Sequence, residues 1–479
     1  MMRLGTLSLC GAALWLSACR TPAPYVPPPT PAPAPETPAD SYKEMHGWKT
    51  AQPSEAVLRG PWWEIFGDPR LSALEQQVDV SNQDLKAAEA RFRQARAMIR
   101  FNRASEFPTI SVAPDLADLR DSNHQPYAGS NWTSTGQFML PFDVSYELDI
   151  WGRIRQRVAA TREEAQASAA DLESVRLILH SELAFDYFEL RSADAQKRLL
   201  DQTVRSYEEA MRLTVSRFEE GAAPKSEVAQ ARTQLESATV ADTDIAVQRA
   251  QYEHALAVLT GKPPSEFELS PAMPPFAPPA IPVGLPSQLL ERRPDIAAAE
   301  RRVAEANEEI GIARAAYYPT VSLSAALGLE GHSITSWLTW PSRFWAVGPS
   351  MAETLFDAGR RRATSEAAIA SYDAAVAQYR QSVLAAFQQV EDNLAVLRVL
   401  EQEAGQQRHA TESANQSLEL ATNRYREGAD PYLQVLAAQT IALANQRNEL
   451  DILRRRMDAS VLLIKALGGG WTIAALPKP

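Results

Sequence analysis

Residues able to carry catalysis or bind a metal are scattered along this chain of 479 residues. Metal sites need ligands at short, regular spacings, and no such spacing joins the histidines. The chain contains no G-x-S-x-G, no H-E-x-x-H and no G-x-x-x-x-G-K-[ST], and Gly261-Lys262 follows a predicted helix where a phosphate loop follows a strand. The sequence therefore predicts a protein that is not an enzyme and holds no metal or cofactor. Its six histidines are predicted to be solvated or packed: His46, His124, His180, His254, His332 and His409.

One of the two cysteines, Cys19, stands where a covalent modification is expected. Arg3 precedes an apolar run from Leu4 to Leu16, which is too short for a membrane-spanning helix of about 20 residues. The run ends in Leu16-Ser17-Ala18-Cys19, which resembles a bacterial lipobox. Residues 1–18 are therefore predicted to be a signal peptide, and Cys19 is predicted to become the lipidated first residue of the mature chain.

The lipid on Cys19 is predicted to hold the protein on a membrane surface, since acyl chains contribute about 0.8 kcal/mol per buried CH₂. Cys10 leaves with the signal peptide, so the mature chain keeps one cysteine and forms no internal disulfide. Arg20 follows Cys19 at the position where lipoproteins of the inner membrane typically carry aspartate. This difference favours the outer membrane as the destination.

Composition sets two further limits. The formal net charge is −11, and no block of Lys or Arg offsets it, which argues against a nucleic-acid partner. The stretch from Pro22 to Pro38 is proline-rich and is expected to be an extended or disordered tether. We therefore assign residues 19–61 to a lipidated, Pro-rich tether, and expect no packed core before about Trp62.

The rest of the chain is an internal duplication. The stretch from Gly152 to Pro263 returns 207 positions later, from Gly359 to Gly470. Each copy has a Gly/Pro turn, R-F-E-E-G-A-A-P at 217–224 and R-Y-R-E-G-A-D-P at 424–431. The predicted first repeat covers 62–262 and the second 288–470, each with a helix, a β-hairpin and a long helical hairpin. The predicted connector is 263–287, and the predicted tail is 471–479.

Very long helices dominate both repeats. Val383, Phe387, Val390, Leu394 and Leu397 step by four and three residues, which is the heptad spacing of a coiled-coil seam. The pattern predicts two uninterrupted helices of about 100 Å each, with shorter helices stacked end to end beside them. The long helices are predicted over 153–218 and 360–425; the first is flanked by 224–258 and 288–318, and the second by 431–467 and 71–106.

Two regions change to the period of a strand. Even positions from Phe138 to Ile150 are apolar, while odd positions include Asp143 and Glu147. Residues 321–329 alternate in the same way, and Thr109–Leu116 is the weakest candidate of four strands. A soluble sandwich strand and a barrel strand between lipid and water both fit this alternation. Trp337, Trp340 and Trp345 cluster beside the fourth strand, where an aromatic belt is expected in the barrel alternative.

The ordered set of motifs between Trp62 and Leu467 resembles the TolC/OprM-like outer-membrane efflux family, and the lipobox resembles its lipoprotein (NodT/OprM) branch. Four amphipathic strands cannot close a barrel alone, so this resemblance implies an oligomer. The motifs are Trp62-Trp63 with Phe66, Asp68, Leu71 and Leu74, then Asn82 and Leu85, Phe107-Pro108, L-L-E-R-R-P-D-I at 289–296, Tyr318-Pro319 and Leu355-Phe356-Asp357-Ala358-Gly359-Arg360.

The resemblance implies a mostly α protein with a small β part, in which long coiled-coil hairpins form an α-helical barrel. It implies a homotrimer whose strands form a shared 12-stranded transmembrane β-barrel in the outer-membrane lipid. It also implies a function as the passive exit duct of a tripartite efflux system. The implied partners are a periplasmic adaptor (membrane fusion) protein and an inner-membrane transporter that delivers the substrate.

The resemblance further assigns the repeat turns to the periplasmic tip. By position, Tyr425 matches the tyrosine of the tip gate and Glu227 the acid that it binds. Gln434 and Ala437 stand where relatives often place aspartates, although Asp430 and Glu427 keep acidic groups at the mouth. The implied tip-gate set is Glu227, Arg424, Tyr425, Asp430 and Gln434, and the implied adaptor-docking turns contain Arg217, Gly221 and Gly428.

Two other classes of protein share some of these features. A periplasmic adaptor lipoprotein carries a lipobox, but it has one helical hairpin flanked by β domains. A structural coiled-coil lipoprotein needs no segments of period two. Two hairpins and four amphipathic strands favour the efflux duct over both alternatives.

Overall fold

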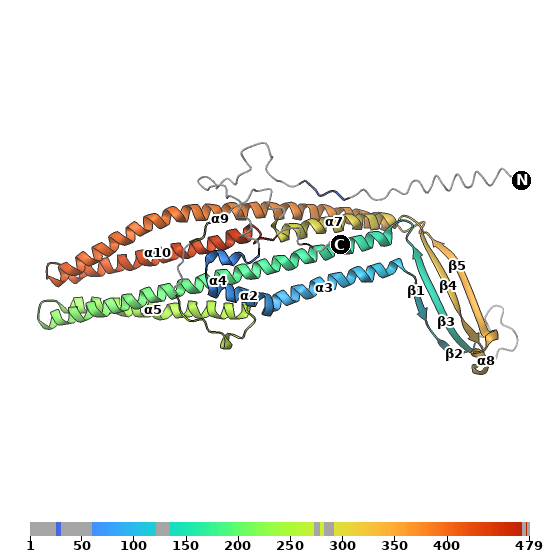
Figure 1. The fold of residues 1–479 in the computed structure, drawn as a ribbon, viewed down its shortest axis with the longest axis horizontal. Helices are drawn as coiled ribbons and strands as arrows, with labels where there is room; N and C mark the ends of the chain where they lie inside the picture. The colour runs from blue at the N-terminus through green and yellow to red at the C-terminus, as the bar shows by residue number, and fades with distance from the viewer. Residues whose placement is uncertain are drawn as a thin grey trace.

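The chain folds into a long helical rod with a β-sheet at one end (Figure 1). This computed structural model describes residues 25–29, 60–120, 135–272, 278–281 and 292–471, and residue 476. The predictions on the signal peptide, on Cys10 and Cys19 and on most of the tether lie outside the described residues. The domain limits remain predictions.

Two helices of 67 residues each run along the rod, α4 (Arg153–Glu219) and α9 (Arg360–Arg426). Each is about 100 Å long and starts after a glycine with positive φ, Gly152 at 80° and Gly359 at 88°. Each turns back into a helix of 35 residues, α5 (Lys225–Leu259) and α10 (Tyr432–Ala466). The equal lengths agree with the duplication seen in the sequence.

Shorter helices pack along the long ones, both in the half of the rod next to the sheet and in the half away from it. α5 and α7 (Pro294–Ala315) both pack along α4, as predicted. The predicted helix 71–106 is instead two helices, α2 (Pro69–Ser81) and α3 (Gln83–Arg103), because the buried Asn82 caps α3 and donates to the carbonyl of Leu259. Within the chain α3 packs chiefly on α4, so its predicted place beside the second long helix was wrong.

Short 3₁₀ segments link these parts: η4 (Trp62–Phe66), η5 (Ala104–Glu106), η6 (Pro264–Glu266) and η8 (Trp340–Ser342). A one-turn helix, α8 (Ile334–Trp337), lies at the far end of the sheet. None of the helices that the structure describes combines the length and the apolar character needed to cross a membrane.

The sheet is antiparallel and is built from β1 (Thr109–Val112), β2 (Asp115–Leu119), β3 (Thr135–Leu148), β4 (Thr320–Gly331) and β5 (Arg343–Ala352). β1 and β2 both pair with β3, so together they occupy the place of one strand. The break between them contains Pro114, which has no N–H to give to the ladder. The weakest predicted strand is therefore real but interrupted.

The register carries the alternation of β3 across the whole sheet. Val144 pairs with Ile110 and with Ala325, and Ala325 pairs with Val347. The next position along β3, Ser145, starts a polar row with Thr109 and Ser324. One face of the sheet is thus mostly apolar on every strand and the other is mostly small or polar, with Met139 and Phe344 among its exceptions. Members of the apolar face are exposed in the chain, among them Ile110, Val112, Phe142, Leu323, Leu327, Trp345, Val347 and Met351.

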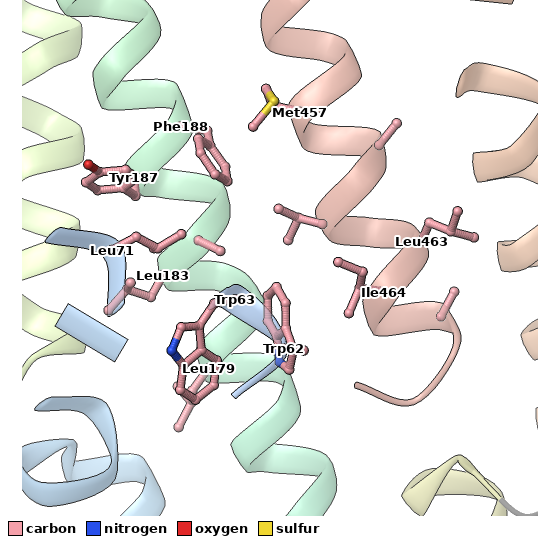
Figure 2. Close-up of a cluster of buried hydrophobic side chains, with 14 of the residues drawn as sticks. Trp62, Trp63, Leu71, Leu179, Leu183, Tyr187, Phe188, Met457, Leu463 and Ile464 are labelled. Atoms are coloured by element: carbon pink, nitrogen blue, oxygen red, sulfur yellow. The ribbon is translucent and has the colours of Figure 1, made fainter. Parts of the chain in front are cut away.

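The largest core joins the two repeats near the middle of the rod (Figure 2). Trp62 and Trp63 pack against Leu179 and Leu183 of α4, with Met457 and Ile464 of α10 opposite. Tyr187 donates a hydrogen bond of 2.5 Å to Asp68, which also caps α2. The residues that carry the family resemblance at the start of the first repeat are thus packing and capping residues.

A small part of the tether is also packed. Tyr25 joins a cluster with Ile296 and Val303 of α7 and Tyr379 of α9, and its hydroxyl donates to the carbonyl of Glu300 at 3.4 Å. Burial raises the pKa of Tyr25. The prediction that no core begins before about Trp62 was therefore wrong at this residue. The aromatic ring of Tyr25, within the Pro-rich stretch, packs against apolar side chains of α7 and α9.

Candidate functional site at the hairpin tips

The two repeat turns lie at the end of the rod farthest from the sheet (Figure 1). Gly221 and Gly428 have φ of 75° and 78°, a left-handed conformation that ends α4 and α9 with little strain only for glycine. Pro224 and Pro431 are in the extended conformation directly before α5 and α10. The turn chemistry inferred from the sequence is confirmed, and it brings both hairpins to one end.

Tyr425 lies at the centre of the contact between the hairpins. Its side chain is 2% exposed although it sits at the last turn of α9. Its hydroxyl lies 3.2 Å from a carboxylate oxygen of Glu227 on α5 and 3.3 Å from the hydroxyl of Thr214 on α4. Burial raises the pKa of Tyr425, and the Glu227 carboxylate adds to this shift. The phenol therefore stays a neutral donor toward Glu227.

Arg217 ties the hairpins together from the other side of the same tyrosine. Its guanidinium carbon lies 4.4 Å from the centroid of the Tyr425 ring, and its Nη1 donates to the main-chain carbonyl of Tyr425. A planar guanidinium can stack on a ring and donate at its edge at the same time. The sequence placed Arg217 only in a docking turn, whereas the structure brings it to the candidate gate.

Asp430, which was expected to keep the mouth acidic, is paired with Arg424. Arg424 donates to Asp430 with Nε at 2.5 Å and Nη2 at 3.1 Å, across the turn after α9. This pairing lowers the pKa of Asp430 and raises that of Arg424. Asp430 therefore carries its charge next to a cation. Gln434 is exposed one turn into α10, close to the tip but without a side-chain contact to Tyr425 among the described hydrogen bonds.

Two residues at this site were not identified from the sequence. Thr214 is fully buried and faces the Tyr425 hydroxyl, and Tyr432 stacks edge-on against Tyr425 at 5.4 Å. Thr214 and Arg217 are one helical turn apart on α4, so they share a face. This spacing could have identified Thr214 from the sequence only if the hairpin that faces α4 had been known.

The described part of the chain contains no cluster of three or more His, Cys, Asp or Glu residues fit to hold a metal ion. Of the six histidines, His180 is buried by packing. Its ring stacks on Trp63 at 4.5 Å, its Nδ1 lies 2.7 Å from Glu75 and its Nε2 lies 3.4 Å from Asp79. His46 and His124 lie outside the described residues.

Comparison with known proteins shows what the whole chain is similar to. The chain is 33% identical over 461 residues to the toluene efflux pump outer membrane protein TtgF of Pseudomonas putida, covering 95% of each. It is 32% identical over 480 residues to the pyoverdine export outer membrane protein OpmQ of Pseudomonas aeruginosa, covering 98% of each. The solved outer-membrane channel OprN has a TM-score of 0.83 at 29% identity, over 93% of this chain and 99% of that one.

The family comparison also reproduces the duplication. The model described as "Outer membrane efflux protein" matches residues 74–262 and again residues 285–469. These two segments hold the two helical hairpins and their strands, and they leave out the tether. The chain belongs to the outer membrane efflux protein family.

Proposed function

We propose that this chain is the outer-membrane channel subunit of a tripartite efflux system and gives substrates a passive exit duct from the periplasm to the outside. The observation that carries this proposal is the sheet at one end of a helical rod about 100 Å long, with an apolar face that continues across every strand. Such a sheet suits lipid on one side and water on the other.

The open edges of the sheet support a homotrimer. β1 with β2 forms one edge and β5 the other, and an open edge is not tolerated in lipid. Three copies of this sheet, joined edge to edge, give the proposed 12-stranded barrel. The helices of the three copies then form an α-helical tunnel that continues the barrel through the periplasm. The sheet with its apolar face argues against a structural or adaptor-type lipoprotein, because neither function requires a lipid-facing sheet.

We assign the partners from the two ends of the rod. The turns around Gly221 and Gly428 are exposed at the tip and are the proposed docking surface for a periplasmic adaptor protein. The adaptor links the tip to an inner-membrane transporter, which supplies the energy and selects the substrate. A lipid on Cys19 anchors the other end at the outer membrane, and neither catalysis nor a cofactor is part of the proposal.

The tip contacts are the proposed gate. Tyr425 joins α9 to Glu227 on α5, and Arg217 joins α4 to Tyr425, so the two hairpins of one chain cannot separate without breaking these bonds. Hydrogen bonds to a carboxylate are stronger than neutral ones, and this one is partly shielded from water. Arg424, Asp430 and Gln434 line the adjoining mouth rather than the bond itself.

The gate is tested by Glu227→Ala combined with Tyr425→Phe. The double variant removes the carboxylate and the hydroxyl but keeps the ring that fills the site, so the tip should open without unfolding. We expect a higher single-channel conductance than wild type in planar bilayers. Thr233→Val is a matched control, because its hydroxyl bonds only to Ala229 of its own helix. Wild-type conductance in the double variant would remove this pair from the gate.

A further inference from the structure

A second set of contacts joins the hairpins above the tip. Tyr207 on α4 and Gln234 on α5 lie seven residues from Thr214 and Glu227, respectively, on the sides of these residues farther from the turns. Seven residues are two helical turns, about 10 Å, so the two sets lie on the same faces of α4 and α5. The tip contacts around Tyr425 are called the lower level here, and the contacts around Tyr207 the upper level.

One hydroxyl connects three helices at the upper level. The Tyr207 hydroxyl accepts from Nε2 of Gln234 on α5 at 3.2 Å and donates to the main-chain carbonyl of Gln439 on α10 at 3.5 Å. Gln234 also lies 3.4 Å from the hydroxyl of Thr440 on α10. Tyr207 and Gln439 are 4% and 6% exposed. The second repeat is thus tied to both helices of the first.

An apolar layer separates the two levels. Tyr425, Tyr432, Val435 and Ala231 form a buried cluster between α5, α9 and α10. The Tyr432 hydroxyl points to the upper level and lies 3.4 Å from the side-chain oxygen of Gln439. This layer lies between the two sets of contacts, so each level can break separately.

The two levels differ in chemistry. The lower level uses a carboxylate and a guanidinium, Glu227 and Arg217, beside an exposed turn. Salt and a charged partner surface weaken such bonds. The upper level uses only hydroxyl, amide and carbonyl groups, and its tyrosine is buried, which raises the pKa of Tyr207. Hydrogen bonds between uncharged groups respond little to salt, because salt screens charges.

We propose that the closed tip is held at two levels, and that the uncharged upper level around Tyr207 limits how far the hairpins part once the charged lower level is released. This inference rests on the proposed gate and adds a second, separately breakable restraint to it. Release of the lower level alone gives a partly open tip, and full opening requires both levels to break.

Single-channel conductance in planar bilayers can distinguish the contribution of each level to the closed tip. The upper-level variant is Tyr207→Phe with Gln234→Leu, and the lower-level variant is Glu227→Ala with Tyr425→Phe. We expect the upper-level variant alone to conduct like wild type, the lower-level variant to conduct more, and the combined variant to exceed the lower-level variant severalfold. Tyr379→Phe, which removes a buried hydroxyl of α9 away from the tip, controls for loss of a tyrosine hydroxyl.

A distance measurement decides the inference even if conductance does not report the tip. Ala222 and Ala429 are both exposed in the two turns, so both positions can carry spin labels when replaced by cysteine. Pulsed electron resonance should give wild-type distances in the upper-level variant, longer ones in the lower-level variant and the longest in the combined variant. Equal distributions in the lower-level and combined variants would overturn the upper level, whereas unchanged conductance with changed distances would overturn only the proposed gate.

Discussion

At the residue scale, two acidic side chains of the tip already have partners. Glu227 faces the Tyr425 hydroxyl, and Asp430 faces Arg424 with two contacts at 2.5 and 3.1 Å. Gln434 and Ala437 on α10 supply no carboxylate at their own positions. The mouth of the duct is therefore less able to hold a cation than an aspartate ring.

Divalent cations should consequently block the wild-type channel only weakly. Arg424→Ala should strengthen the block, because it frees the Asp430 carboxylate of each subunit to face the pore. Titration of single-channel current with millimolar Mg²⁺ or Ca²⁺ measures this effect. Adding Asp430→Asn to Arg424→Ala should abolish the gain. Strong block of the wild type, lost in Asp430→Asn, would contradict the prediction.

A second residue-scale prediction concerns Glu75, which is fully buried on α2 against His180. Burial raises the pKa of Glu75 from 4.5 to about 7, while His180 opposes the shift. The folded state thus holds this proton more tightly than the unfolded state. Its contribution to stability is complete below pH 4.5 and is lost as the pH rises to about 7, an effect on the order of 3 kcal/mol.

Glu75→Gln should therefore flatten the pH dependence of thermal stability between about pH 5 and pH 8, with most gain at the alkaline end. Asp79→Asn is the matched control, because Asp79 faces the other nitrogen of His180 from the partly exposed side, near Arg176. Thermal melts followed by tryptophan fluorescence suit the assay, since Trp63 stacks on His180. A pH slope unchanged by Glu75→Gln would show that this carboxyl does not titrate in the range.

At the scale of elements, the long helices and the sheet contribute different surfaces to the molecule. The helices hold two hairpin tips at one end of the rod, and the sheet lies at the other end (Figure 1), where it presents an apolar face. Trp340 in the β4–β5 connection and Trp345 near the start of β5 are 77% and 75% exposed, and an interfacial aromatic belt fits the proposed barrel there. The strand register makes this division testable residue by residue.

Arginine at Val144 should impair barrel assembly, while arginine at Ser145 should be tolerated. Val144 belongs to the apolar row with Ile110 and Ala325, whereas Ser145 belongs to the polar row with Thr109 and Ser324. A charge on the lipid face near mid-membrane costs about 2–4 kcal/mol. Trimer bands on gels without heating report assembly, and equal tolerance at both positions would indicate a soluble sheet.

At the scale of the whole molecule, the chain is long, open at its sheet edges and predicted to be lipidated near its amino end. The tether is not wholly loose, because Tyr25 packs between α7 and α9 six residues after Cys19. Six extended residues reach about 20 Å. A lipid on Cys19 would thus be held within about 20 Å of the first half of α7, where Tyr25 packs.

Cys19→Ser should leave a chain that folds but is held poorly in the outer membrane. The signal peptide and the helical rod are unchanged, whereas the acyl chains that anchor the amino end are lost. Membrane fractionation with mass spectrometry of the amino-terminal peptide checks this. An unmodified Cys19 in the wild-type protein would contradict the lipoprotein prediction.

Local signals in the sequence were enough to predict most of the elements. Heptad spacing predicted the two long helices, alternation predicted the strands, and Gly221 and Gly428 with the prolines that follow predicted the turns. Each of these signals depends on residues within a few turns of one another. The duplication then placed equivalent elements in both repeats, and the ordered motifs indicated the family.

Which side chains meet across the rod became visible only in the folded chain. Arg217 stacks on Tyr425, Tyr207 reaches Gln439 and Tyr25 packs against Tyr379, and each pair is separated by more than 200 residues. No local period encodes such contacts, because they depend on how two hairpins rotate and shift against each other. Asp430 and Arg424 are only six residues apart, on either side of the turn at Gly428. Their pairing still depends on the directions of the two side chains, which the positive φ of Gly428 sets.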